Sequence, residues 1–225
     1  MRSRVRGGWN AGVVVVIATV LVIGCTNFPG GEAPVAGSGS VVTEDRQVGE
    51  FDKVEGSNGL RLVLSIGATN SVQVSAHENI VPLVSTTVTD GTLEATLTRP
   101  VSGTAPITVT VVTPALTALT LHDGVSADAT GIAAASLSLD ADDGAHASLS
   151  GTVDRLTITA DNGAFLQLGG LVAANATVSL SNGVTGQVHV TGTMSGTASN
   201  GVLLSVVGGG EVSVSTSGGA FITSR

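Results

Sequence analysis

The sequence predicts an all-β protein built as a single-stranded β-helix, a solenoid with coils of about 18–20 residues. Three observations lead to this prediction. A glycine-terminated tripeptide recurs along the second half of the chain, apolar residues keep a fixed phase around it, and strand and turn formers dominate the composition. Self-similarity at a fixed period is typical of repeat architectures.

The recurring tripeptide has the chemistry of a tight turn. Asn-Gly and Asp-Gly favour tight turns because both residues tolerate positive φ. Successive glycines of the pattern are 20, 19, 20, 18 and 18 residues apart. The six copies are His122-Asp123-Gly124, Asp142-Asp143-Gly144, Asp161-Asn162-Gly163, Ser181-Asn182-Gly183, Ser199-Asn200-Gly201 and Ser217-Gly218-Gly219.

Apolar residues recur directly after each glycine, and again three positions after it and five before it. Strand side chains alternate between two faces, so these positions share the face that we expect to be buried. Each repeat is therefore predicted to be strand, tight turn, strand and a looser turn. The residues directly after the glycines are Val125, Ala145, Ala164, Val184, Val202 and Ala220.

Two architectures are compatible with strands joined in this way. In an antiparallel β-sandwich, consecutive strands pair as hairpins. In a β-helix, each repeat is one coil and equivalent positions stack about 4.8 Å apart. The same apolar positions in all six repeats favour the β-helix, because a hairpin meander needs no such positional identity.

Composition and charge exclude several classes of protein. Gly accounts for 31 of 225 residues, aromatic residues for 2%, and Tyr is absent. Helix formers such as Glu, Lys and Arg are scarce, which excludes an ordinary helical or α/β enzyme. The net charge is −8, and three of the nine basic residues precede all 17 acidic ones. A nucleic-acid partner is not expected, because phosphate contacts need clustered Lys and Arg.

The first 24 residues are predicted to be a lipoprotein signal peptide. A basic start precedes the apolar run 11–23, which has the length of a signal peptide core rather than of a comfortable membrane span. The run ends in Leu21-Val22-Ile23-Gly24-Cys25, which resembles the bacterial lipobox. The resemblance implies cleavage before Cys25, the only cysteine, and lipidation of its thiol. The competing interpretation is an uncleaved anchor helix with an incidental cysteine.

The lipidated cysteine and a flexible linker are predicted to span residues 25–46, and the folded domain residues 47–225. Residues 26–40 are rich in Gly, Pro, Ser and Ala and have few large apolar side chains. Strands are expected near 51–54, 60–66, 71–76, 85–89, 92–98 and 106–112. We expect them to continue the solenoid or to cap its N-terminal end, since an open end exposes unpaired edges and core.

The order of these signals resembles a known family. An early Phe51-x-x-Val54 leads into Gly56-Ser57-Asn58-Gly59, followed by Val74-Ser75-Ala76-His77-Glu78-Asn79, a strand–Asp90-Gly91–strand unit and the terminal repeats. This order is similar to that of the putative auto-transporter adhesin head GIN domain family. The resemblance covers about residues 47–225, and this chain has Ser-Asn-Gly and Asp-Asn-Gly in place of a literal Gly-Ile-Asn. It implies an exported β-helical domain, often on a bacterial lipoprotein, and supplies no catalytic residues.

The Asp and His residues that could serve catalysis or metal binding do not show the spacing that such sites need. The carboxylates Asp123, Asp140, Asp142, Asp143 and Asp161 could cluster on neighbouring coils and serve acid–base catalysis or calcium binding. Turn formation explains them better. The histidines His77, His122, His146 and His189 lack metal-ligand spacing. No metal, cofactor or catalytic residue is predicted.

The sequence therefore favours a non-enzymatic lipoprotein of the cell envelope. We expect it to be anchored outside the cytoplasm through lipid on Cys25 and to present a β-helical surface for adhesion or envelope assembly. Its expected partner is an envelope or host surface polymer or protein, bound through a broad Ser/Thr/Asn face. The alternatives are an envelope scaffold without a specific ligand and a β-helical enzyme acting on polysaccharides.

Overall fold

The computed structural model describes residues 31–225, and Glu32–Arg225 form one compact unit. The predicted signal peptide, the expected boundary at residue 24 and Cys25 lie outside the described residues. No helix of the described part is long and apolar enough to cross a membrane.

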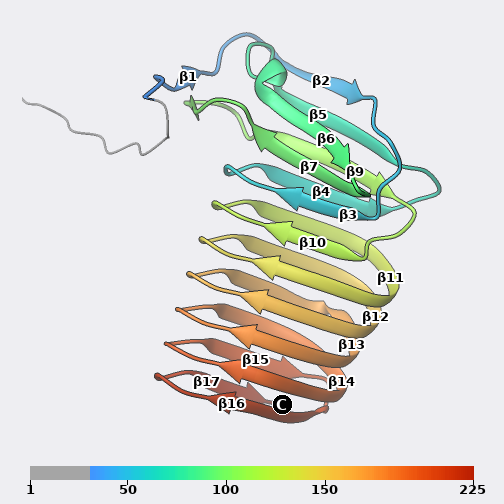
Figure 1. Cartoon of the computed structure of the whole chain (residues 1–225), viewed down its shortest axis with the longest axis vertical. Helices are drawn as coiled ribbons and strands as arrows, with labels where there is room; N and C mark the ends of the chain where they lie inside the picture. The colour runs from blue at the N-terminus through green and yellow to red at the C-terminus, as the bar shows by residue number, and fades with distance from the viewer. Residues whose placement is uncertain (1–30) are drawn as a thin grey trace, which may run out of the picture. The chain divides into compact units, whose positions relative to one another are not determined.

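The unit is a two-sided β-solenoid, shown in Figure 1 as a stack of flattened coils. We call face A the sheet whose strands run into the tight turns, and face B the sheet whose strands leave them. Four long strands pass from face B to face A within one coil: β11 (Ser126–Ala141), β12 (His146–Ala160), β13 (Phe165–Leu180) and β14 (Thr185–Ala198). Face A also contains β3 (Lys53–Gly56), β10 (Ala118–Leu121) and β16 (Glu211–Thr216), and face B contains β4 (Arg61–Ile66), β15 (Leu203–Val207) and β17 (Phe221–Ser224).

Neighbouring coils pair in parallel throughout this stack, with equivalent positions opposite each other. The predicted β-helix is therefore confirmed, and the antiparallel sandwich is excluded for the repeat region. Parallel strands that return to the same sheet need a crossover, which the second face of the coil provides here.

The tight turns stack into a ladder along one edge of the solenoid. The first central residue of each turn has positive φ, from 48° at Asp143 to 62° at Asn58, and the glycine after it also does. The N–H of every stacked turn glycine before the last described turn donates to a carbonyl of the next turn, for example from Gly144 to Asn162 at 3.0 Å. The stacking of equivalent positions that the β-helix predicts is thereby confirmed for these glycines.

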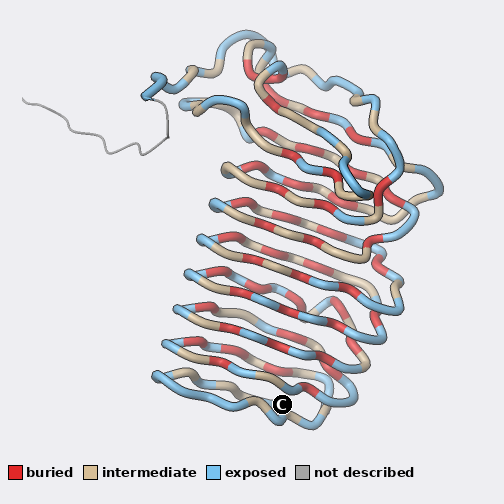
Figure 2. The backbone as a smooth tube through the Cα atoms, in the orientation of Figure 1, coloured by how far each residue is buried: buried red, intermediate tan, exposed pale blue. Residues whose placement is uncertain are grey.

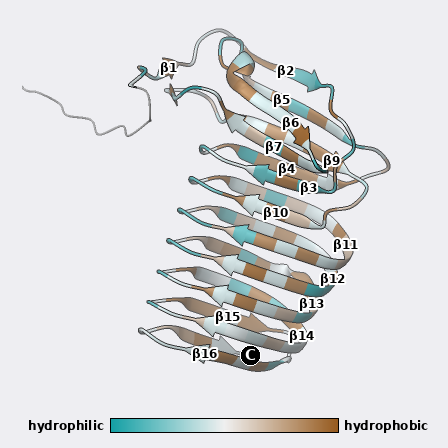
Figure 3. Ribbon diagram, viewed as in Figure 1, coloured by the Kyte–Doolittle hydropathy of each residue, from teal (hydrophilic) through white to brown (hydrophobic). Residues whose placement is uncertain are grey.

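The core runs as a narrow apolar strip between the two faces (Figures 2 and 3). Five of the six residues that follow the turn glycines are fully buried: Val125, Ala145, Ala164, Val184 and Val202. Ala220, in the last coil, is only partly buried. Small side chains are required here because the two sheets enclose a thin core.

The N-terminal strands both continue and cap the solenoid. β7 (Thr92–Leu97) and β9 (Thr108–Thr113) add parallel strands to β3 and β4. β5 (Ser71–His77) and β6 (Val84–Thr89), joined by the 3-10 turn η1 (Val81–Leu83), then pair antiparallel with β9 and β7. Reversed strands at this end stop the parallel stacking, so both sequence expectations for this region hold.

Residues expected to form a flexible linker contain strands in the structure. β1 (Val35–Ala36) pairs with β8 (Val101–Ser102), and β2 (Val41–Arg46) pairs antiparallel with β5. The side chain of Asn79 accepts a hydrogen bond from the Ser38 N–H at 2.8 Å. The segment differs from the expectation because main-chain pairing holds it, and its side-chain composition gave no signal of that pairing.

Candidate functional site

Four of the five predicted carboxylates, Asp123, Asp142, Asp143 and Asp161, belong to the tight turns, and Asp140 lies near the end of β11. Asp123 and Asp143 are turn residues with φ of 53° and 48°. Asp161 accepts hydrogen bonds from the Asn162 N–H at 2.6 Å and from the Asn182 side chain at 2.7 Å. These bonds lower the pKa of Asp161 below its ordinary value, the Asn162 N–H being the largest cause. A carboxylate held in this way stabilises a turn and is poorly placed to transfer protons.

The structure does bring two of the predicted residues together. His122 Nδ1 lies 2.6 Å from Asp142 Oδ1 on the next coil. Partial burial lowers the pKa of His122, but the hydrogen bond and charge of Asp142, with the charges of Glu55 and Asp140, outweigh burial and raise it. Burial and the neighbouring Asp142 raise the pKa of Asp140. This cluster is a partly exposed ion pair at the edge of face A.

The remaining histidines contact other groups. His77 and His189 place Nδ1 against the carbonyl oxygens of Gly39 and Gly169, at 2.9 and 3.2 Å. His146 packs edge-on against Phe165, with ring centres 5.1 Å apart. Within residues 31–225, no group of three or more His, Cys, Asp or Glu side chains is placed to hold a metal ion.

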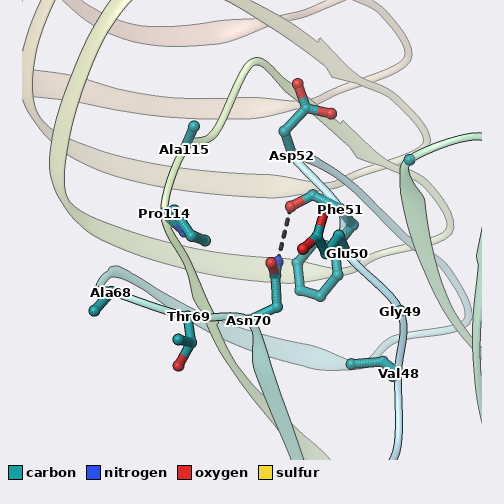
Figure 4. A pocket seen from close by; sticks show the side chains of 11 residues that line it. Val48, Gly49, Glu50, Phe51, Asp52, Ala68, Thr69, Asn70, Pro114 and Ala115 are labelled. Atoms are coloured by element: carbon teal, nitrogen blue, oxygen red, sulfur yellow. Dashed lines mark hydrogen bonds between the residues drawn. The ribbon is translucent and has the colours of Figure 1, made fainter.

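A hollow of about 700 Å³ lies where the loops before β3 and β10 meet the loop before β5 (Figure 4). Its polar groups hold these loops together. The Asn70 amide donates to the Phe51 carbonyl at 2.8 Å, and the Thr117 hydroxyl donates to the Asp52 carboxylate at 2.9 Å. We therefore interpret this hollow as a loop junction, because the amide of Asn70 and the carboxylate of Asp52 already have partners.

Face A presents two exposed columns of mostly hydroxyl side chains. The alternation of each strand turns these residues outward while their neighbours enter the core. Register places the members of each column directly opposite one another on successive coils. The columns are Ser138, Thr157, Thr177, Ser195 and Ser213, and Thr120, Asp140, Thr159, Ser179, Thr197 and Ser215.

Face B carries an apolar column instead. Phe165, Leu203 and Phe221 point outward and are 40%, 53% and 62% exposed. Register places them in one column with Thr185 between Phe165 and Leu203. The third described phenylalanine, Phe51, is buried, so both exposed aromatic rings of the described residues lie in this column. Exposed large apolar side chains grouped in this way are characteristic of binding surfaces.

Polar side chains and a shallow hollow accompany the apolar column. Gln167, Gln187, Ser205 and Thr223 form the next outward column of face B. A hollow of about 640 Å³ lies between the columns over β12–β14, lined by Phe165, Gln167 and Gln187 with Gly169 and Gly170 beside them. A second hollow of about 210 Å³ continues beside Leu203 and Phe221. We call Phe165, Gln167, Gln187, Leu203 and Phe221 the face B patch.

The sequence contained a signal for this patch that our prediction of a Ser/Thr/Asn face did not use. Phe165, Leu203 and Phe221 each lie two positions after a turn glycine. The residue directly after each of these glycines points to the core, so the next one must point outward. Large apolar residues at an outward position of three repeats indicate a surface patch.

This chain resembles a known protein family and several solved structures. A family model described as "Putative auto-transporter adhesin, head GIN domain" matches residues 50–210. A crystal structure of a putative adhesin from Bacteroides fragilis is similar, at 16% identity, a TM-score of 0.70 and coverage of 85% of this chain and 100% of that one. A crystal structure of a putative lipid binding protein from Parabacteroides distasonis is also similar, at 14% identity, a TM-score of 0.53 and coverage of 86% of this chain and 100% of that one. A comparison with curated proteins gave no match.

Proposed function

Because the chain belongs to the family of putative auto-transporter adhesin head GIN domains, we propose that it is a non-enzymatic, lipid-anchored envelope protein that binds surface polysaccharide through the face B patch. The family and the solenoid fold support the adhesin-like role. We add the polysaccharide ligand, the binding role of the face B patch and the lipid anchor as proposals.

The single observation that carries the proposal is the apolar column of face B. Phe165 exposes its ring beside the amides of Gln167 and Gln187, and Phe221 exposes its ring beside Ser205 and Thr223. A sugar ring has an apolar face and a rim of hydroxyl groups. The aromatic rings would cover the apolar face, and the amides would both donate to and accept from the hydroxyl groups.

Energetics favour this patch over the hydroxyl columns of face A. Covering apolar surface contributes about 25 cal/mol per Å², so a half-exposed phenylalanine offers on the order of 1–2 kcal/mol. A hydroxyl on a flat exposed face exchanges a bond with water for a bond with the ligand and gains little. Face A would add only weak contacts by comparison.

The extended shape of the patch suits a polymer. Its members come from successive coils of one stack, so a ligand along the solenoid axis contacts several equivalent positions. Repeated weak contacts on one chain raise the overall affinity without any deep pocket.

A glycan array of the soluble unit Glu32–Arg225, followed by calorimetry on the polysaccharides retained, tests the proposal. We expect Phe165→Ala to weaken binding about tenfold, since removing a half-covered ring costs on the order of 1.4 kcal/mol. Thr157→Val and Thr177→Val, on the hydroxyl columns of face A, are matched controls and should bind as the parent does. All variants should keep the parent's circular dichroism spectrum.

Two results would overturn the proposal. If the face A variants lose binding while Phe165→Ala keeps it, the hydroxyl face is the binding surface. Release of reducing ends or unsaturated sugars, abolished by Asp142→Asn or Asp161→Asn, would instead establish the polysaccharide-acting enzyme.

The anchor is tested separately, through Cys25. Replacing Cys25 with Ser removes the only thiol that a lipid could occupy. We expect the variant to leave the membrane fraction and to lose the mass of the acyl chains, measured by cell fractionation and mass spectrometry. A variant that stays membrane-bound with unchanged mass would contradict lipidation and favour an uncleaved anchor helix.

A further inference from the structure

The last described coil leaves its end of the solenoid open. No strand of residues 31–225 pairs with the outer edges of β16 and β17. Val212, Val214, Ala220 and Ile222 are only partly buried there, and a hollow of about 320 Å³ lies among them. Unpaired edges above an incompletely covered core are a pairing surface.

The hydrogen bonds on the inner side of this end show which backbone groups of its strands remain unpaired. The N–H groups of Phe221 and Arg225 donate to Val202 and Val206 at 2.7 and 3.0 Å. Strand alternation therefore turns the N–H and C=O groups of Ile222 and Ser224 outward.

The same alternation applies to β16. The N–H of Ser217 donates to Ala198 at 3.0 Å, so Ser213 and Ser215 bond toward β14. The N–H and C=O groups of Val212 and Val214 then point away from the solenoid. β17 thus offers two residues with both backbone groups free, Ile222 and Ser224, and β16 offers three, Val212, Val214 and Thr216.

We infer that a second copy of this chain covers the open end, forming a two-fold symmetric dimer in which β16 of each copy pairs antiparallel with β17 of the other. The two-fold axis lies at the open end and is parallel to the strands. It stacks face A of one copy on face B of the other and leaves the tight turns of both copies on the same side. β16 runs toward the tight turn and β17 away from it, so the strands brought together are antiparallel.

The register that this symmetry imposes matches the side chains and the free backbone groups. Val214 lies opposite Ile222 of the second copy, and Val212 opposite Ser224, as hydrogen-bonded pairs. The half-buried residues meet over the open core, while the outward Ser213 lies opposite Thr223 on the surface. The strands need no shift in register, because the paired residues of β16 and β17 lie equally far from the tight turn.

Charge complementarity supports the same register. Glu211 begins β16, and Arg225 directly follows β17. In the dimer, Glu211 of one copy lies opposite Arg225 of the other, and symmetry makes two such pairs. β2, which ends face B at the opposite end of the solenoid, carries Glu44, Asp45 and Arg46 within six residues. Charges on an edge strand disfavour pairing, so head-to-tail stacking is not expected and the dimer closes.

A charge exchange tests the interface in the soluble unit Glu32–Arg225, with sedimentation equilibrium as the measurement. The parent should form dimers, and Glu211→Arg or Arg225→Glu alone should weaken dimerisation about tenfold by placing like charges opposite each other. The double variant should restore it, because the pairs are reformed with their signs exchanged. A parent that stays monomeric at its highest soluble concentration, or single variants that dimerise like the parent, would overturn the inference.

A disulfide tests the register. The unit contains no cysteine, so Ser213→Cys with Thr223→Cys should oxidise to a covalent dimer, since antiparallel neighbours come within disulfide reach. The matched control is Ser195→Cys with Ser205→Cys, at the equivalent positions one coil further in, and it should stay uncrosslinked. Equal crosslinking of both pairs would show random collision and overturn the proposed register.

Discussion

His122 makes the stability of the turn ladder depend on pH. Its pKa in the folded protein is raised above the ordinary 6.5: burial lowers it, but Asp142, Glu55 and Asp140 outweigh burial. A raised pKa means that the folded state holds the proton more tightly than the unfolded chain does. The stabilising contribution is therefore complete below pH 6.5 and is lost as the pH rises through the folded-state pKa.

Urea unfolding between pH 6 and 9 measures this effect. We expect the free energy of unfolding to fall as the pH rises above 6.5, and to do so less in His122→Gln. Asp140, whose pKa burial and Asp142 also raise, changes stability in the same direction but at more acidic pH. Equal pH dependence in the parent and in His122→Gln would contradict the role of this pair.

The buried alanines that directly follow turn glycines limit the width of the core. Ala145 and Ala164 are fully buried directly after two turn glycines. Replacing either with Leu adds three carbon atoms between closely packed sheets and should cost roughly 1–3 kcal/mol. Thermal melts of both variants provide the measurement, with exposed Ala133→Leu as the matched control. Melts of Ala145→Leu and Ala164→Leu that match the parent would mean that the core yields easily.

At the scale of the element, glycines serve two different purposes. Gly163 occupies the left-handed position of a tight turn, and an added Cβ would meet no atom within 4 Å. Gly196, inside β14, has a φ of 132°, and a Cβ there would clash with the backbone of Val178 on the adjacent coil. The first position requires glycine for its conformation alone, and the second requires it for close approach as well.

Substitution by alanine separates these two purposes. Gly163→Ala should cost roughly 1–2 kcal/mol, the cost of placing an L-residue in the left-handed region. Gly196→Ala should cost more, because two packed coils must move apart. Chemical denaturation of both variants tests the order. A smaller loss for Gly196→Ala would contradict the close packing of these coils.

The elements that the sequence predicted are those in which local chemistry and register agree. Each turn from Gly124 onward could be placed because the tripeptide and its apolar neighbours recur together. The turn at Asn58-Gly59 has the same chemistry and stacks on the next one, its Gly59 N–H donating to Asp123 at 2.9 Å. The repeat period of the sequence could not show this stacking, because strands β5–β9 lie between the two turns.

The face B patch and β2 were harder to predict, for different reasons. The outward phase of Phe165 and Phe221 was present in the repeats, but their proximity required the stacking order of the coils. β2 has few apolar residues and is held by backbone pairing with β5, which leaves little trace in composition. The lipid on Cys25 stays a prediction.

For the whole molecule, stability in a solenoid comes from contacts between neighbouring coils, so the ends decide its behaviour. The N-terminal end is covered by strands that run against the parallel stack. β2 protects the edge of β5, and the Arg46 side chain donates to the Val81 carbonyl at 2.7 Å. A molecule without this cover would expose a strand edge above a fully buried core.

Deleting residues 32–46 tests this role of the cap. We expect the free energy of unfolding to fall by a few kcal/mol, since one antiparallel strand pairing is lost, and aggregation to increase with concentration as the β5 edge becomes free. Urea denaturation and light scattering provide the measurements. Deleting only residues 32–40 removes β1 and its short pairing with β8 but keeps β2, so it should cost less stability and should not increase aggregation. If both deletions behave alike, β2 is not the strand that closes this end, and the antiparallel pair β5–β9 must itself be a sufficient cap.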